Sequence, residues 1–226
     1  MEFSFDGIGS AAQSMSPAAI PTGHNNKGFF KRALMNLFII AFMFGFVELY
    51  TFCLGSGNGL IGLTISLAII SFWRTDIGIK PLQGAFVIWG AFLLTGGATF
   101  LASFHPAIGV FVNFASIYTI LTLTSHQPMA KAYYPILSCY LFAQSSPVYG
   151  IDYGLRMIGI AGGGLIVAII YYIRHRKVKR RRNITDIFRE THFCSIRTKF
   201  FIRLTTGLTI AMLIGDFYHV LKPAWI

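Results

Sequence analysis

The sequence predicts an all-α polytopic membrane protein, and two observations carry this prediction. The segment between Lys80 and Lys131 contains no Asp, Glu, Lys or Arg. The whole chain is 54% hydrophobic and only 12% charged, with a mean hydropathy of +0.62. A soluble domain needs charged residues over its surface, whereas a helix crosses a bilayer with about 20 apolar residues. The segment without charge is therefore long enough for two crossings.

The apolar stretches predict six transmembrane helices and a seventh that begins a second repeat. These spans are expected at 34–54, 60–73, 85–101, 108–123, 134–148, 153–173 and 200–221. The fifth contains Pro135 and Pro147, and Pro147 is expected to end its helix. The predicted organisation is an N-terminal tail over 1–28, a six-helix domain over 29–173, a basic linker over 174–199, and the first helix of a second repeat over 200–226.

The basic residues predict the orientation of these spans. The net charge is +11, and the run Arg174–Arg182 alone holds seven Lys or Arg. Lys31, Arg74, Lys80 and the basic run fall at boundaries on one side, so the positive-inside rule predicts a multi-pass protein of the cell (inner) membrane with a cytoplasmic N-terminus. Because the run directly follows an apolar span, its expected partners are anionic lipid headgroups and not nucleic acid.

The seventh predicted span begins like the first. Phe29-Phe30-Lys31-Arg32 is similar to Phe200-Phe201-Ile202-Arg203, and internal repeats are common in secondary transporters. Two interpretations follow: the chain continues past Ile226 into a second set of spans, or it is a complete seven-span protein.

The seventh predicted span has a basic helix start at Arg203, an apolar stretch, and a cluster with Pro223 and Trp225. This combination resembles the start of a repeat in fusaric acid resistance and aromatic acid exporter-like (FUSC) proteins. In the first copy, Gly57–Gly59 stands where that cluster would lie. The resemblance implies a secondary transporter, or half of one, that exports small, in part aromatic, organic acids with proton coupling. It also implies a periplasmic partner subunit in some members. No GxxxxGK[ST] motif occurs, and neither an enzyme nor a cofactor is predicted.

Arg156 is the predicted residue for binding an anionic substrate. A guanidinium can hold a carboxylate through two parallel hydrogen bonds, and Arg156 lies just inside the sixth predicted span. Asp152 lies four residues earlier, on the same face of a helix. The alternative is therefore an interfacial Asp152–Arg156 pair at the membrane surface.

Proton coupling is predicted at Glu48, Asp216 and His219, because ionisable groups inside spans are costly and are often functional. The alternative is that the carboxylates are hydrated at the headgroup level. Close helix packing is predicted at Gly96, Gly97, Gly159 and Gly163, since small residues let helices approach in a bilayer. An unwound substrate site at 162–164 is the alternative.

Two other functions remain open: a membrane scaffold or assembly subunit without transport, and an anion channel. A homo-oligomer is compatible with each of them. The three cysteines show no metal-binding spacing, so no metal is predicted.

Cysteine labelling tests the predicted orientation. Cysteines introduced at Ser103 and Gly150 should react with an impermeant maleimide in intact cells, and one at Lys179 only after permeabilisation, because basic loops stay in the cytoplasm. Labelling of position 179 in intact cells would reverse the assignment.

Overall fold

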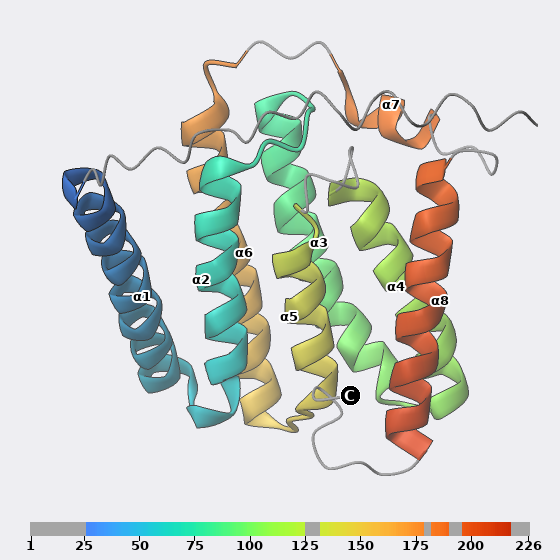
Figure 1. Cartoon of the computed structure of the whole chain (residues 1–226). Coiled ribbons are helices and arrows are strands. Elements are labelled where there is room, and N and C mark those ends of the chain that lie inside the picture. Colours follow the sequence, from blue (N-terminus) through green and yellow to red (C-terminus); the bar gives the residue numbers. More distant parts are fainter. Residues whose placement is uncertain (1–25, 125–131, 179–181, 190–195, 218–226) are drawn as a thin grey trace, which may run out of the picture. The chain divides into compact units, whose positions relative to one another are not determined.

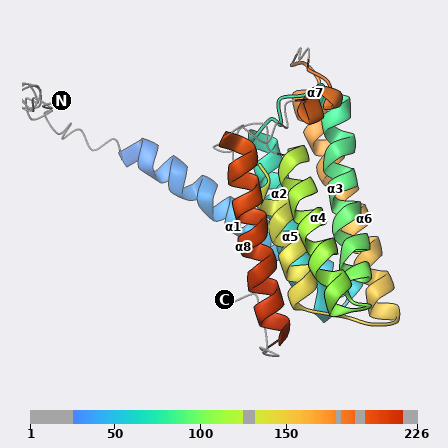
Figure 2. The same cartoon turned by 90° about the vertical axis from the view of Figure 1, so that its right-hand side faces the viewer.

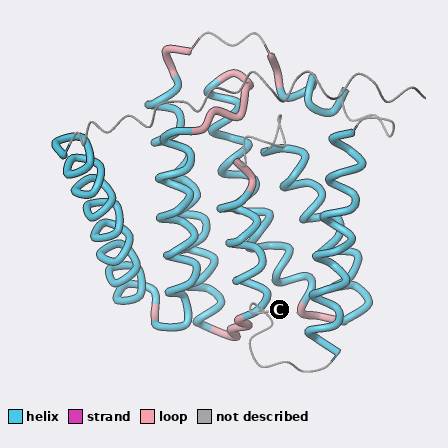
Figure 3. Tube along the Cα trace, in the orientation of Figure 1, coloured by secondary structure: helices cyan, strands magenta, loops and turns pink. Residues whose placement is uncertain are grey.

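The computed structural model describes residues 26–124, 132–178, 182–189 and 196–217, and all regular structure in this part is helical (Figures 1 and 3). The helices are α1 (Asn26–Leu54), the short 3₁₀ helix η1 (Ser56–Asn58), α2 (Gly59–Arg74), α3 (Pro81–Ala102), α4 (Pro106–Thr124), α5 (Tyr134–Ser145), α6 (Ile151–His175), α7 (Ile184–Arg189) and α8 (Ile196–Phe217).

Among the described residues, six helices are long and apolar enough to cross a membrane: α1, α2 with η1, α3, α4, α6 and α8. The chain is therefore all-helical with the composition of a multi-pass membrane protein, as the hydropathy pattern predicts. The identity of the membrane and the side on which the N-terminus lies stay predictions. The seventh predicted span corresponds to α8, and its role as the first helix of a second repeat also stays a prediction.

Helix α5 differs from the predicted fifth span. It has 12 residues, about 18 Å at 1.5 Å per residue, whereas the hydrocarbon core is about 30 Å thick. Pro135 lies in its first turn, where the missing N–H costs nothing, and the helix ends before Pro147 because proline disfavours a helical residue before it. By itself α5 is too short to cross the bilayer.

The chain divides into two compact units between Ile39 and Ile40. The first contributes the N-terminal part of α1. Within the second, α3 packs along α6 and α4, α2 packs against α6 and α5, and α8 packs along α4 (Figure 2). Helix α5 contacts α2, α3 and α4, so this short helix is enclosed by long ones, and its Ile136 and Tyr140 are fully buried.

Glycines on α6 allow its neighbours to approach closely. A Cβ atom on Gly159 would collide with the Tyr50 hydroxyl of α1, and one on Gly163 with Ile65 of α2. A Cβ on Gly164 would lie 2.6 Å from the Cβ of Phe92 on α3. Three helices thus pack closely onto α6 at glycine positions, and of the three contacts the one at Gly164 is the most rigid because it meets a Cβ atom.

Gly96 and Gly97, the two glycines of α3 predicted to pack closely, differ in how near the neighbouring atoms lie. A Cβ on Gly96 would lie 2.5 Å from Sδ of Met157, so this position is tightly packed. A Cβ on Gly97 would meet no heavy atom within 4 Å. The close packing predicted for Gly97 is absent among the described residues, because neighbouring glycines on a helix point in directions about 100° apart.

Alanine substitutions on α6 should separate packing from helix propensity. Gly164→Ala should lower the free energy of unfolding by about 1–3 kcal/mol, the usual cost of overpacking. Gly162→Ala is the matched control, since its Cβ would meet nothing within 4 Å, and it should be neutral or stabilise by up to about 1 kcal/mol. Thermal unfolding of the purified chain in detergent measures both. Equal effects would contradict the observed packing.

Candidate anion-binding pocket at Arg156

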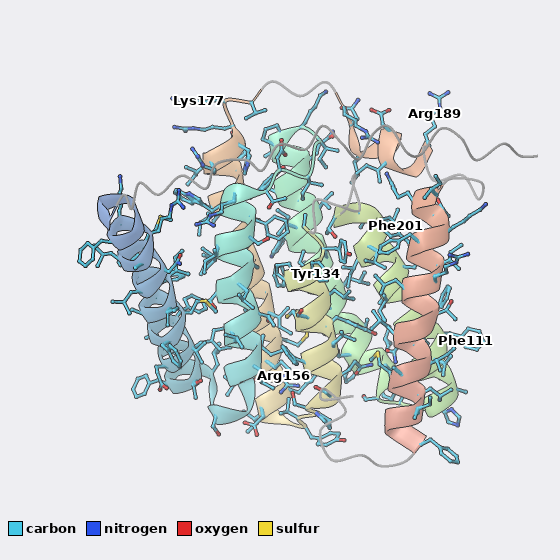
Figure 4. The ribbon with its side chains drawn as sticks, in the orientation of Figure 1. Phe111, Tyr134, Arg156, Lys177, Arg189 and Phe201 are labelled. Atoms are coloured by element: carbon cyan, nitrogen blue, oxygen red, sulfur yellow. The ribbon has the colours of Figure 1, made fainter. Side chains whose placement is uncertain are left out.

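Arg156 lies near the start of α6, and only 2% of its surface is exposed. Figure 4 shows it near one end of the bundle and Lys177 near the other. We call the end with Lys177 the basic end, because Arg74, Lys80 and Arg174 also lie there as exposed residues. Arginine is almost never fully buried without partners, so hydrogen-bond acceptors are expected around this side chain.

Four hydrogen bonds hold the guanidinium of Arg156. Nε donates to Oδ1 of Asn58 at 2.8 Å, and Nη2 donates to the carbonyl oxygen of Gly57 at 2.9 Å. Nη1 donates to the carbonyl oxygen of Ala143 at 3.2 Å and also to that of Ser146. One side chain thereby connects α6 to the turn between α1 and α2 and to the end of α5.

These acceptors are available because helices end beside Arg156. The last carbonyl groups of a helix have no partner within that helix and carry partial negative charge. Ala143 lies in the last turn of α5, and Ser146 is its C-cap. Asn58 also donates from Nδ2 to the carbonyl oxygen of Leu54 at 2.7 Å, in the last turn of α1. The tight turn that follows requires Gly55, whose φ is 90°.

No described carboxylate pairs with Arg156. Asp152 is exposed, and the Asp152–Arg156 pair considered from the sequence spacing is not formed among the described residues. Carbonyl groups satisfy the N–H donors, but they supply dipoles and no net negative charge. Within the described residues the guanidinium is therefore a buried cation with no carboxylate in direct contact, an arrangement that is costly in a medium of low dielectric constant.

A pocket of about 280 Å³ adjoins Arg156. It is formed by the ends of α3 and α5, the start of α6, and the segment between α5 and α6. The lining residues are Thr99, Phe100, Ser103, Ala143, Gln144, Pro147, Val148, Tyr149, Gly150, Tyr153 and Arg156. The rings of Phe100 and Tyr153 lie 5.3 Å apart between centroids. A cavity of about 150 Å³ can hold benzene, so this pocket has room for a substituted aromatic ring.

Polar side chains in and behind the pocket form a second network. Gln144 donates from Nε2 to Oδ1 of Asn113 at 2.7 Å, and the Tyr140 hydroxyl donates to the same oxygen at 2.6 Å. The Tyr153 hydroxyl donates to the carbonyl oxygen of Gly96 at 2.9 Å. Sequence reasoning missed Asn113 and Gln144, although amide side chains inside apolar spans are a recognisable signal because they must find partners there.

Of the predicted proton-coupling residues, Glu48 is the one whose side chain the structure describes, and it does not line this pocket. Glu48 is exposed on α1. Asp216 belongs to α8, but its side chain and the whole of His219 lie outside the described residues. The proton-coupling role of all three stays a prediction.

At the basic end, the chain after α6 folds back onto the segment between α2 and α3. The amide N–H of Lys80 donates to the carbonyl oxygen of Arg182 at 3.1 Å, and that of Ile184 donates to Oε1 of Gln83 at 3.0 Å. The guanidinium of Arg174 lies 5.6 Å from the ring centre of Trp73. The predicted contact of this region with anionic lipid headgroups stays a prediction.

The described fold and pocket define a helical membrane protein with a buried cation beside an aromatic-lined pocket. Comparison with protein-family models, curated proteins and solved structures finds no match for this chain. The similarity to the FUSC family therefore rests on the sequence motifs alone. Among the described residues, no three His, Cys, Asp or Glu side chains are grouped so that they could hold a metal ion.

Replacing Arg156 should destabilise the bundle. Arg156→Met leaves Asn58 and the carbonyl groups of Gly57, Ala143 and Ser146 without their donors, at a cost of about 1–3 kcal/mol for each acceptor that stays buried and unpaired. Arg174→Met is the matched control: this arginine is exposed, and its loss should change the unfolding free energy by less than about 1 kcal/mol. Denaturant unfolding in mixed micelles measures the difference. Equal unfolding free energies for Arg156→Met and Arg174→Met would contradict the hydrogen bonds described for Arg156.

Proposed function

We propose that this chain is a secondary transporter, or half of one, that exports small organic acids, including aromatic ones, through the pocket beside Arg156. The single observation that carries the proposal is a buried guanidinium without a carboxylate partner among the described residues, placed in the wall of a pocket that also contains aromatic rings.

The charge of Arg156 supports an anionic ligand. A guanidinium has five N–H groups, and four hydrogen bonds to protein acceptors leave one Nη2 N–H for a ligand. A bound carboxylate would supply the negative charge that the carbonyl groups cannot. In a site of low dielectric constant, such an ion pair is much stronger than in water.

The remaining walls support an aromatic ligand. Phe100, Tyr149 and Tyr153 line the pocket, and aromatic rings pack favourably against one another in offset or edge-to-face arrangements. The ligand that matches both features is a small aromatic carboxylate. We further propose that efflux is coupled to protons across the cell membrane, with Glu48 and Asp216 as the candidate carboxylates, and that a periplasmic subunit can continue the path.

A non-transporting assembly subunit is the second candidate. The observation in its favour is that Arg156 is already bonded to two separate segments, the turn between α1 and α2 and the end of α5, which is how a purely structural arginine would be used. Under this alternative, the pocket has no ligand and Arg156 only holds the helix ends together.

Narrowing the pocket separates the two candidates. Ser103 is an exposed residue of the pocket lining, so Ser103→Trp should block the pocket and leave the hydrogen bonds of Arg156 intact. Ala107→Trp is the matched control, because Ala107 is also exposed but does not line the pocket. In proteoliposomes with an imposed pH gradient, Ser103→Trp should reduce benzoate transport at least tenfold, a change of about 1.4 kcal/mol in binding.

The control variant should transport benzoate at the rate of the unmodified chain. If both tryptophan variants transport benzoate equally, and faster than empty liposomes, the transport path does not run through this pocket. No benzoate transport by the unmodified full chain would favour the assembly subunit.

A further inference from the structure

The orientation of the Gln144 amide is fixed by a hydrogen bond to Asn113, a residue that does not line the pocket. Gln144 lines the pocket, and its Nε2 donates to Oδ1 of Asn113 at 2.7 Å. Asn113 is 5% exposed and Tyr140 is fully buried, and the Tyr140 hydroxyl donates to that same oxygen at 2.6 Å. Two buried side chains thus hold the amide of Gln144 in place.

This bonding leaves one end of the amide free. Oδ1 of Asn113 accepts from both the Tyr140 hydroxyl and Nε2 of Gln144, so in this structure Nε2 faces Asn113 and Oε1 faces away. Among the described residues, Oε1 has no hydrogen-bond donor, and it is absent from the buried side-chain atoms that lack partners. It is thus an accessible acceptor on a residue that lines the pocket, and Arg156 also lines that pocket.

We infer that Gln144 determines which acids bind, by accepting a hydrogen bond from a hydroxyl or amino substituent of a small aromatic carboxylate. The inference rests on the proposed function and adds the substrate class. The carboxylate lies toward Arg156, and the substituent that donates a hydrogen bond lies toward Oε1 of Gln144. A few fixed polar groups in a mostly apolar pocket orient a ligand in this way.

Binding of matched ligands tests this role. The probes are benzoate, the three hydroxybenzoate isomers and the three methoxybenzoates, whose ether oxygen cannot donate a hydrogen bond. For the purified full chain in nanodiscs, at least one hydroxybenzoate should bind about 2- to 10-fold more tightly than benzoate, the range expected for one neutral hydrogen bond. Its methyl ether should lose this advantage.

Three variants test whether Gln144 causes the preference for hydroxybenzoate over benzoate. Gln144→Met keeps an unbranched side chain of similar size but removes the amide, so hydroxybenzoate should bind no better than benzoate, while the Kd of benzoate changes less than twofold. Asn113→Leu should reduce the preference as well, because the amide of Gln144 is then free to rotate. Gln83→Met is the matched control at the basic end, where Gln83 bonds Ile184, and it should keep the preference.

The outcomes distinguish this inference from the proposed function. If Gln144→Met keeps the preference for hydroxybenzoate, Gln144 does not select the ligand, although benzoate binding still supports the anion site. If the unmodified chain binds benzoate but prefers no hydroxybenzoate, the inference is also wrong. If the unmodified chain binds none of the probes, both the inference and the proposed function fail. Should Gln144→Met not fold, Gln144→Leu and the methoxybenzoate series provide the same comparison.

Discussion

The end of the bundle that contains the pocket depends on the buried guanidinium of Arg156. It bonds the turn between α1 and α2 and the final carbonyl groups of α5, so two chain segments converge on one side chain of α6. Helix ends inside a protein need partners for their free carbonyl groups, and a cation at the carboxyl end of a helix is favourable. Arg156 meets both needs, but its charge stays without a carboxylate partner in the described part of the chain.

The pocket exists because α5 is short. A helix that continued past Ser145 would bond the carbonyl groups of Ala143 and its neighbours within the helix, and they would not be available to Arg156. Instead the chain turns through Pro147 and Gly150, whose φ is 62°, and it then begins α6. Further along α6 the packing is tight, since its glycines lie against α1, α2 and α3. Close packing and an open pocket therefore occur along the same helix.

The sequence predicts the long helices well because membrane insertion depends on the length and apolarity of a segment. The enclosed position of α5 is harder to predict, since an apolar stretch with two prolines can be a kinked span or a short helix. Arg156 is recognisable as a costly residue, but its acceptors are not: Gly57, Ala143 and Ser146 bond it through main-chain carbonyl groups, which every residue type possesses. The spacing of Asp152 and Arg156 suggests a helical pair that the fold does not form.

A double-mutant cycle between Arg156 and Asn58 tests the central claim most directly. The unfolding free energies of the unmodified chain, Arg156→Met, Asn58→Leu and the double variant give the coupling energy between the two side chains. A hydrogen bond to a charged group predicts a coupling of about 1.5–3 kcal/mol. If the changes in unfolding free energy caused by the two substitutions add within about 0.5 kcal/mol, the claim that Arg156 holds this end of the bundle together is contradicted.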